Sequence, residues 1–168
     1  MELWRLSMSE FALKAVSADR RFIVYIEPEP LAFMIAAAHA AKGVETGGIL
    51  IGYIDAQGQA VVREATGKPR GSRFTWRTFL RRTEGLPSLL RARWTKNEYY
   101  LGEWHSHPGG SLNPSEQDRV TMRGIACDAN YHCTAPILAI VATRGNFAEV
   151  SVTVFPRLER ELHLGSEN

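Results

Sequence analysis

Residues 102–118 read GEWHSHPGGSLNPSEQD, and most of what the sequence predicts depends on this stretch. If it begins as a β-strand, His105 and His107 project from one face, because side chains alternate between the two faces of a strand. The Pro/Gly-rich residues that follow end the strand and let the chain turn back. Ser115 is a good helix N-cap, which places Asp118 in the first turn of the next helix. The stretch therefore predicts two imidazoles and one carboxylate on neighbouring elements.

Two imidazoles and one carboxylate are the three-ligand set of a catalytic zinc site, in which water takes the fourth position. Zinc lowers the pKa of that water to about 7, so hydroxide forms at neutral pH. A general base must stand beside the water, and two glutamates compete for this role. On strict alternation, Glu103 shares the strand face of His105 and Leu101. Glu45 lies just before another apolar strand, and local geometry leaves the choice between the two glutamates open.

The same residues also permit interpretations without a metal. Ser115 and Asp118 are close to a capping box, which would only start the helix. A pair of strand histidines could line a polar surface. The two features together, joined by a short turn, favour a metal site over either alternative. Other metal motifs are absent from the sequence, which has no His-Glu-x-x-His helix and no Pro-Cys-x-x-Cys pair.

Hydrophobic periodicity and turn residues predict alternating strands and helices around this stretch. The predicted strands are Phe22–Ile26, Gly47–Ile54, Gln59–Ala65, Tyr99–His105, Pro136–Thr143 and Phe147–Phe155. The predicted helices are Leu31–Lys42, Thr75–Arg82, Pro87–Trp94 and a helix from Ser115 to about Asn130. This order predicts an α/β (α+β) sandwich, in which helices flank a curved mixed sheet.

The whole chain, 1–168, is predicted to be a single domain. Its predicted parts besides the sheet and helices are an N-terminal extension (1–20), a basic insertion (66–98) and a charged tail (157–168). Between positions 68 and 96, nine Lys and Arg residues are opposed by a single acid, Glu84. The insertion could receive an acidic partner, but a solvated helix face is the favoured interpretation. Its Trp94 is predicted to pack in a small core.

Composition excludes several classes of protein. The 168 residues are 45% hydrophobic, enough for one compact domain with a sizeable core. The net charge of +2 predicts no strong attraction to nucleic acid or anionic membranes. The longest apolar run, Leu31–Ala38, is far shorter than the roughly 20 residues that span a bilayer. With two cysteines and no signal-peptide pattern, a cytoplasmic location is expected.

Three segments together resemble the JAB/MPN domain with the JAMM metalloprotease motif. That motif has a glutamate before a Gly-x-Leu-x-Gly-like strand, then His-x-His-Pro, then Pro-Ser-x-x-Asp. The corresponding segments here are ETGGILIG (45–52), HSHP (105–108) and PSEQD (114–118). The resemblance extends from about Phe22 to Phe155 and implies a JAB/MPN (cytidine deaminase-like) architecture. The segment YLGEWHSHP (100–108) is similar to bacterial stand-alone members found in anti-phage operons, both CBASS-associated and ubiquitin-like conjugation systems.

The resemblance also implies roles for individual side chains. It implies that one catalytic Zn²⁺ is bound by His105, His107 and Asp118. Glu45 matches the general acid/base, and Ser115 matches the residue that helps to stabilise the oxyanion. Glu103 is then left as either an orienting partner of a ligand histidine or an ordinary strand residue.

By the same resemblance, the chain is expected to be a deubiquitinase-like, zinc-dependent isopeptidase or peptidase of antiviral defence. Its substrate would be a bond after the C-terminus of a ubiquitin-like protein or of a conjugated bacterial defence protein. Its operon partners would resemble ubiquitin-activating and ubiquitin-conjugating enzymes, without membrane partners and with nucleic acid disfavoured. Three alternatives stay open: a non-catalytic MPN scaffold, a RadC-like DNA-associated protein, and a hydrolase of small peptides or sulfur carriers.

A second metal site is a weaker hypothesis. Cys127, His132 and Cys133 are close in sequence, but a fourth ligand is not apparent and the spacing is not that of a structural zinc site. A buried thiol is therefore the favoured interpretation of Cys133 or Cys127.

Overall fold

The structure of the chain is a computed structural model that describes residues 12–67 and 85–167. The predicted helix Thr75–Arg82 lies outside these residues, together with Trp76 and the basic residues of the insertion that precede position 85. Most of the described residues form strands and helices close to the predicted ones.

Within the described residues, the strands are β1 (Leu13–Ser17), β2 (Ile23–Ile26), β3 (Gly47–Ile54), β4 (Ala60–Ala65), β5 (Tyr99–Pro108), β6 (Ile137–Arg144), β7 (Phe147–Val154) and β8 (Leu162–Glu167). The helical segments are α1 (Pro28–Ala40), α3 (Gly85–Trp94), α4 (Glu116–Cys127) and the short 3-10 helix η1 (Ala129–Tyr131). The predicted helix after Ser115 is thus two segments, because the chain leaves the α-helical conformation at Asp128. No helix in the described part of the chain has the length and apolar character needed to cross a membrane.

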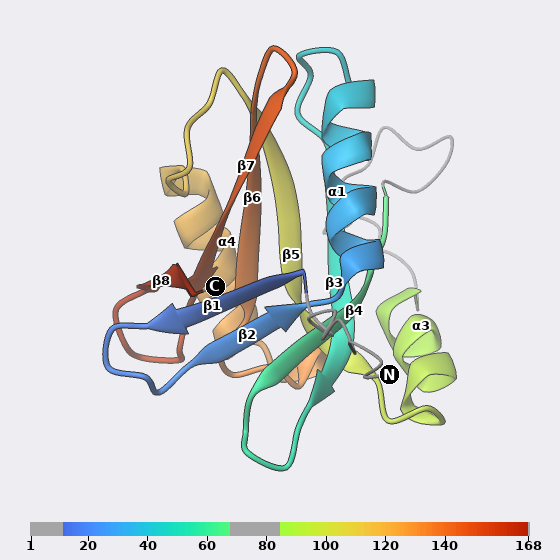
Figure 1. Ribbon diagram of the computed structural model, residues 1–168. Helices are drawn as coiled ribbons and strands as arrows, with labels where there is room; N and C mark the ends of the chain where they lie inside the picture. Colours follow the sequence, from blue (N-terminus) through green and yellow to red (C-terminus); the bar gives the residue numbers. More distant parts are fainter. Residues whose placement is uncertain (1–11, 68–84, 168) are drawn as a thin grey trace, which may run out of the picture.

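The strands close into a barrel in the order β1-β2-β4-β3-β5-β6-β7-β8 (Figure 1). Pairing is parallel between β2 and β4 and between β5 and β6, and antiparallel elsewhere. This confirms the predicted fold class, a curved mixed sheet flanked by helices.

Closure of the barrel depends on two strands that the sequence analysis did not predict. β1 and β8 pair with each other along Lys14–Ser17 and Leu164–Glu167. The assignments of Leu13–Ser17 to an extension and of Leu162–Glu167 to a charged tail are corrected accordingly. Both segments are short and only partly apolar, so the local pattern is weak, and the pairing that closes the barrel joins residues about 150 positions apart.

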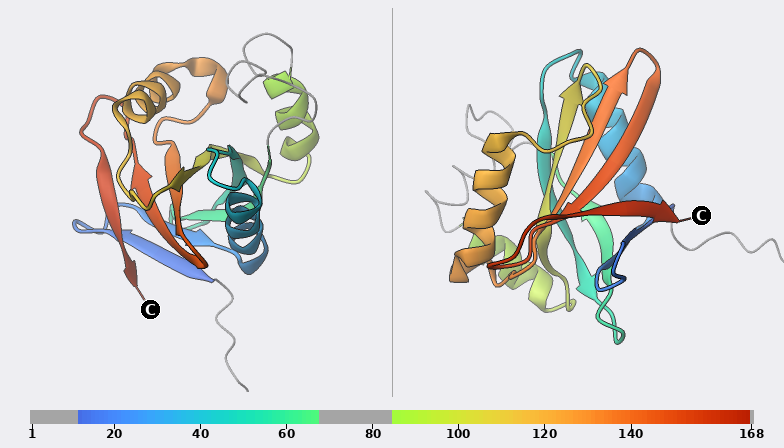
Figure 2. Two further views of the ribbon diagram at one scale, coloured as in Figure 1. Left: turned by 90° about the horizontal axis from the view of Figure 1, so that it is seen from above. Right: turned by 90° about the vertical axis from the view of Figure 1, so that its left-hand side faces the viewer.

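Two buried cores lie on opposite faces of the central strands β3, β5 and β6. The core under α1 includes Met34, Ala38, Leu50, Trp104 and Val141. The core under α4 includes Ile49, Tyr100, Met122, Ile125 and Leu138. The two helices lie on opposite sides of these strands when the molecule is seen from above (Figure 2).

A β-bulge in β5 changes which side chains share a face. Leu50 of β3 pairs with Gly102, but the next residue of β3 pairs with Tyr100, so the ladder skips Leu101. As a result, Leu101 lies in the core under α1, whereas Tyr100 lies in the core under α4. A bulge of this kind inserts one extra residue and reverses the alternation beyond it.

The bulge corrects one detail of the sequence analysis. Glu103 was expected on the face of Leu101, but it lies on the α4 side with His105, and Leu101 lies on the other side. Glycine is required at the bulge, because a Cβ atom at Gly102 would lie 1.9 Å from the Ile137 carbonyl oxygen.

The described part of the basic insertion is anchored to the sheet by an ion pair. Arg93 of α3 binds Glu64 of β4, with an N–O distance of 2.6 Å, and also faces Glu98 at 3.5 Å. Trp94 does not pack in a core as predicted; it is 44% exposed and lies edge-on to the ring of His132. Its place at the last turn of α3 leaves much of the side chain in solvent.

Trp104 supplies a test of the core under α1. It is fully buried, and its indole N–H donates a hydrogen bond of 2.8 Å to the Thr66 carbonyl. The Trp104→Phe variant loses this donor, so we expect the free energy of unfolding to fall by about 1–3 kcal/mol in urea denaturation. The matched control Val120→Ala, at a side chain that is 58% exposed, should change it by less than about 0.5 kcal/mol. Equal stability of Trp104→Phe and the parent protein would contradict this account.

Candidate functional site

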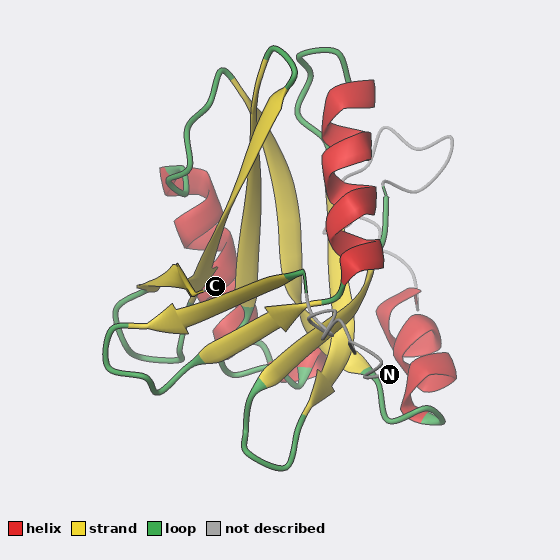
Figure 3. Cartoon of the chain, viewed as in Figure 1, coloured by secondary structure: helices red, strands yellow, loops and turns green. Residues whose placement is uncertain are grey.

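The candidate site lies at the C-terminal end of β5. Three connections meet at this end of the molecule: the α1–β3 loop, the β5–α4 loop and the β6–β7 hairpin (Figure 3). On one side β5 pairs with β3, where His105 is opposite Gly47; on the other it pairs with β6, where His107 is opposite Ala142. The two histidines are therefore held between two neighbouring strands.

Gly47 leaves room for the first of these rings. A Cβ atom at this position would lie 2.4 Å from the Trp104 carbonyl oxygen and 2.9 Å from the Cδ2 atom of His105. Contacts under 3.0 Å would force the strand or the ring to move. The glycine that precedes the apolar part of β3 therefore serves the site as well as the sheet.

Asp118 is positioned by the amphipathic face of α4. Its buried residues include Asp118, Met122 and Ile125, which lie on one stripe of the helix because they are spaced by four and three residues. Met122 and Ile125 pack in the core under α4, and this packing carries the first turn of the helix to the end of β5. Asp118 lies on the same face of the helix, one turn before Met122, and faces the histidines.

The start of α4 is a capping box, as the metal-free alternative predicted. The Asp118 N–H donates to the Ser115 Oγ at 3.1 Å, and the Ser115 N–H donates to the Asp118 Oδ2 at 2.8 Å. The Ser115 hydroxyl also donates to Oδ2 at 2.7 Å. Capping and site formation are thus combined in one carboxylate, because Oδ2 caps the helix while Oδ1 remains for His105.

Asp118 contacts both imidazoles. Its Oδ1 lies 3.0 Å from the Nδ1 of His105, and its Oδ2 lies 3.5 Å from the Nε2 of His107. The second nitrogen of each ring is held by a different acceptor. The Nδ1–H of His107 donates to the Ser111 carbonyl at 3.1 Å, and the Nε2 of His105 lies 3.3 Å from the Oε2 of Glu103.

Charge in the cluster is shared between His105 and its carboxylates. Burial alone would lower the pKa of His105, but hydrogen bonds to Asp118 and Glu103 outweigh it and raise that pKa to about 9. Burial would likewise raise the pKa of Asp118, yet hydrogen bonds from His105 and Ser115 hold it below its usual range. The cluster therefore favours a positive charge between its two carboxylates.

The chemistry of this donor set fits a zinc ion. Ligand atoms around a tetrahedral zinc with bonds of about 2.0–2.2 Å lie roughly 3.3–3.6 Å apart, close to the two contacts that Asp118 makes with the rings. Metal-bound histidines also have their second nitrogen held by a carboxylate or carbonyl, as both rings have here. In the structure, the Asp118 carboxylate contacts the rings of His105 and His107 directly. The described residues contain no group of three His, Cys, Asp or Glu that could hold a metal ion in this arrangement.

Glu45 lies in the exposed α1–β3 loop at the same end of β5. The loop is pinned to the site strand at the next residue, where the Thr46 N–H donates to the Ser106 Oγ at 2.9 Å. The Thr46 carbonyl accepts from the Ser106 N–H at 2.8 Å. This pairing extends the register of β3 and β5, so Glu45 is at the level of His107.

Sequence reasoning missed two groups that orient the site. The Ser111 carbonyl holds His107, and the Ser106 hydroxyl fixes the loop that carries Glu45. The first is a backbone atom of an irregular loop, which no residue-type pattern reveals. The second had a signal: a serine between the two histidines, whose side chain strand alternation directs to the opposite face.

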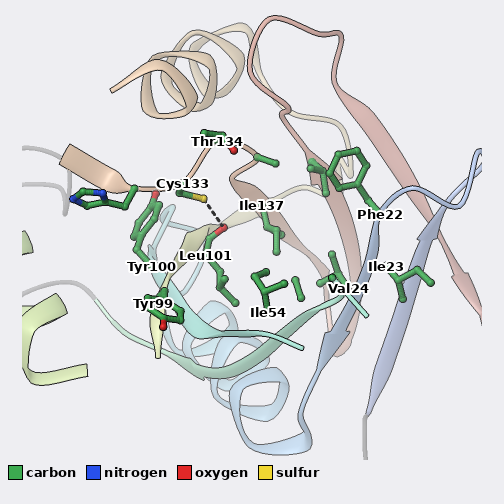
Figure 4. Close-up of a pocket in the computed structure, with 15 residues that line it drawn as sticks. Phe22, Ile23, Val24, Ile54, Tyr99, Tyr100, Leu101, Cys133, Thr134 and Ile137 are labelled. Atoms are coloured by element: carbon green, nitrogen blue, oxygen red, sulfur yellow. Dashed lines mark hydrogen bonds between the residues drawn. The ribbon is translucent and has the colours of Figure 1, made fainter. Parts of the chain in front are cut away.

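A pocket of about 320 Å³ lies near the opposite end of β5 (Figure 4). Its lining is mostly apolar and includes Phe22, Leu101 and Ile137. The Cys133 thiol lies at its wall and donates to the Leu101 carbonyl at 3.8 Å. Cys127 is exposed, and no metal-binding group that includes these cysteines is present among the described residues.

Comparisons with known sequences identify relatives of the chain. A family model described as prokaryotic homologs of the JAB domain matches residues 30–154. A protein of Enterobacter hormaechei subsp. hoffmannii (strain UCI 50), named CD-NTase/cGAS isopeptidase, is 36% identical over 163 residues, which are 95% of this chain and 89% of that protein. A protein of the same name from Pseudomonas aeruginosa (strain BWHPSA011 / Pa011) is 30% identical over 103 residues, 60% of this chain and 63% of the relative.

Solved structures share the fold at low sequence identity. A protein of Desulfitobacterium hafniense, solved in solution, has a TM-score of 0.56 at 17% identity, with 85% of this chain and 88% of that chain covered. A Salinibacter ruber (strain DSM 13855) protein has a TM-score of 0.51 at 18% identity with the same coverage. A JAB1/MPN domain protein of Archaeoglobus fulgidus has a TM-score of 0.46 at 20% identity, covering 81% of this chain and 92% of its own. The first two show that the arrangement of strands and helices recurs in other proteins.

The capping box predicts the effect of removing the Ser115 hydroxyl. In the metal-free protein, Ser115→Ala should lower the free energy of unfolding by about 1 kcal/mol, because the Asp118 N–H loses its acceptor. Thermal or urea unfolding in the presence of a chelator measures this loss. The control Ser111→Ala keeps the carbonyl that binds His107 and loses only a long hydrogen bond of 3.4 Å from the exposed Asn113 N–H, so its stability should stay within about 0.5 kcal/mol of the parent. A loss no larger for Ser115→Ala than for Ser111→Ala would contradict the capping role.

The two thiols should differ in reactivity. Burial raises the pKa of Cys133 to about 11, so its thiolate fraction near pH 8 should be about 100-fold below that of an ordinary cysteine. We expect iodoacetamide to modify exposed Cys127 quickly and Cys133 slowly until the protein is unfolded. Mass spectrometry of the parent and of Cys127→Ser and Cys133→Ser variants assigns the two rates. Equal rates in the folded protein would be inconsistent with a buried Cys133 thiol.

Proposed function

The chain belongs to the family of prokaryotic homologs of the JAB domain, and from this premise we propose that it is a zinc-dependent isopeptidase of bacterial antiviral defence, of the CBASS type. The observation that carries the proposal is the position of Asp118, whose carboxylate contacts both His105 and His107. Two relatives named CD-NTase/cGAS isopeptidase support the reaction class.

His105, His107 and Asp118 are the residues that would hold the zinc ion. When bound, zinc supplies a Lewis acid and lowers the pKa of water enough for hydroxide to form near neutral pH. Asp118 brings a negative charge to this point, and the Ser111 carbonyl accepts the Nδ1–H of His107, so Nε2 is the ring nitrogen that His107 directs at Asp118. The protein's part is to orient these donors on a strand end and a helix start that the cores hold in place.

Glu45 is the proposed general acid/base. Its loop is exposed and pinned beside the histidines, so its carboxylate can reach a substrate that lies over the end of β5. It takes a proton from the attacking water and delivers it to the leaving amine, which allows one residue to serve both halves of the hydrolysis. The more deeply buried Glu103 is 4% exposed and faces His105, a position less suited to a departing amine.

Ser115 is proposed to stabilise the oxyanion of the tetrahedral intermediate. In the structure its hydroxyl donates to Asp118 instead. A hydroxyl has a single proton to donate. The Ser115 hydroxyl must therefore give up its hydrogen bond to Asp118 before it can donate to the oxyanion. Binding of zinc to Asp118 would weaken the present hydrogen bond, because the carboxylate would share its charge with the metal.

The proposed substrate is an isopeptide that joins the C-terminus of a cGAS-like nucleotidyltransferase, or of a ubiquitin-like protein, to an amine of another protein. The names of the two relatives support the first of these. The DNA-associated alternative loses one candidate phosphate contact, because Arg93 in the described part of the basic insertion is engaged by Glu64 and Glu98.

Cleavage of defined substrates tests the proposal. The parent protein, loaded with zinc, should cleave a cGAS-like nucleotidyltransferase whose C-terminus is fused to a reporter or conjugated to a lysine. Glu45→Gln should bind as much zinc but turn over about 100- to 10,000-fold more slowly, because it cannot carry the proton. Gel analysis of cleavage and elemental analysis of zinc measure the two quantities, with Glu29→Gln in the first turn of α1 as the matched control.

Full activity in Glu45→Gln would refute its role as the acid/base. Failure of the parent to cleave either the nucleotidyltransferase substrates or the corresponding ubiquitin-like fusions would refute the isopeptidase proposal. Binding of DNA under the same conditions would then favour the DNA-associated alternative.

A further inference from the structure

Glu103 is a buried carboxylate in an apolar surrounding. Its neighbours on the two adjacent strands are Ile49 of β3 and Leu138 of β6, and both are fully buried in the core under α4. Its own residue is 4% exposed. Of its two carboxylate oxygens, Oε2 lies 3.3 Å from the Nε2 of His105, and Oε1 is buried without a hydrogen-bond partner among the described residues.

A buried glutamate at position 103 is unfavourable for the stability of the fold. Removing a carboxylate from water costs free energy that hydrogen bonds must offset, and within the described part of the chain one of the two oxygens has no donor. An apolar side chain of similar size would pack against Ile49 and Leu138 without that cost. The contact with His105 is therefore the feature that distinguishes a glutamate from a leucine at this position.

We infer that Glu103 is a positioning residue for His105, an inference that rests on the proposed zinc site. Glu103 accepts the N–H of the ring nitrogen that faces away from Asp118, Nε2 in this structure. With the proton held there, the other nitrogen is left unprotonated and directed at Asp118, as a metal ligand must be. A negative partner also makes the imidazole a stronger ligand.

The parallel with His107 supports this assignment. Each ring presents one nitrogen to Asp118 and has the other held by an acceptor. His107 uses the Ser111 carbonyl, which follows it in a loop. His105 lies within the strand, where neighbouring carbonyls are committed to β3 and β6, so a side chain two residues earlier on the same face supplies its acceptor.

Zinc affinity of two variants tests the inference. Glu103→Leu removes the acceptor and should weaken zinc binding by about 10- to 100-fold, whereas Glu103→Gln keeps an acceptor oxygen and should lose less. Competition with a chelating dye measures the affinity, and urea unfolding of the metal-free proteins should show Glu103→Leu at least as stable as the parent. Glu98→Gln is the matched control, a buried carboxylate at the other end of β5 that should not change zinc affinity.

A second measurement needs no variant. In the zinc-loaded parent, the ring N–H of His105 should exchange slowly with solvent in ¹⁵N-edited NMR spectra, because Glu103 holds it in a buried site. Rapid exchange of that N–H in the parent overturns the inference even if Glu103→Leu does not fold. Unchanged zinc affinity in folded Glu103→Leu overturns it as well and leaves the proposed function intact. A parent protein that binds no zinc overturns the proposed zinc site and this inference together.

Discussion

The contact between the Asp118 carboxylate and the two imidazoles is the interaction on which the site depends. It joins the first turn of α4 to the C-terminal end of β5, so it exists only if the helix packs on the sheet at the correct height. Met122 and Ile125 set that height by packing in the core under α4. The same carboxylate caps the helix through Ser115, so the side chain that helps to start α4 is also the one that contacts both histidines.

The sheet contributes to the site through two glycines that lack a side chain, as well as through the side chains that it positions. Gly47 leaves space for the His105 ring, and Gly102 lets the backbone approach Ile137 at a bulge. Because the bulge reverses the alternation, Tyr100 and Glu103 come to the same face, with an aromatic core at one end and a polar cluster at the other. The polar end is where α4 begins, and the positive charge that it favours on His105 is the charge that a metal ion would replace.

Membership in the family of prokaryotic homologs of the JAB domain agrees with the order of the motif along the chain. The glutamate loop, the histidine strand and the aspartate helix are separated by about 60 and about 10 residues, yet the fold brings all three to one end of β5. The Thr46–Ser106 pair explains how: it extends the β3–β5 ladder beyond the last regular residues and carries the glutamate loop with it.

The sequence by itself determined what depends on neighbours along the chain. His105, His107, Ser115 and Asp118 could be predicted together because strand alternation and helix capping act over two to four residues. Only the tertiary structure decided that Leu101 leaves the face shared by Glu103 and His105, since that depends on a bulge opposite β3. It also decided that Leu13–Ser17 and Leu162–Glu167 close the barrel. Their pairing is formed between the two ends of the chain, and hydrogen bonds between distant segments leave little trace in the local order of residues.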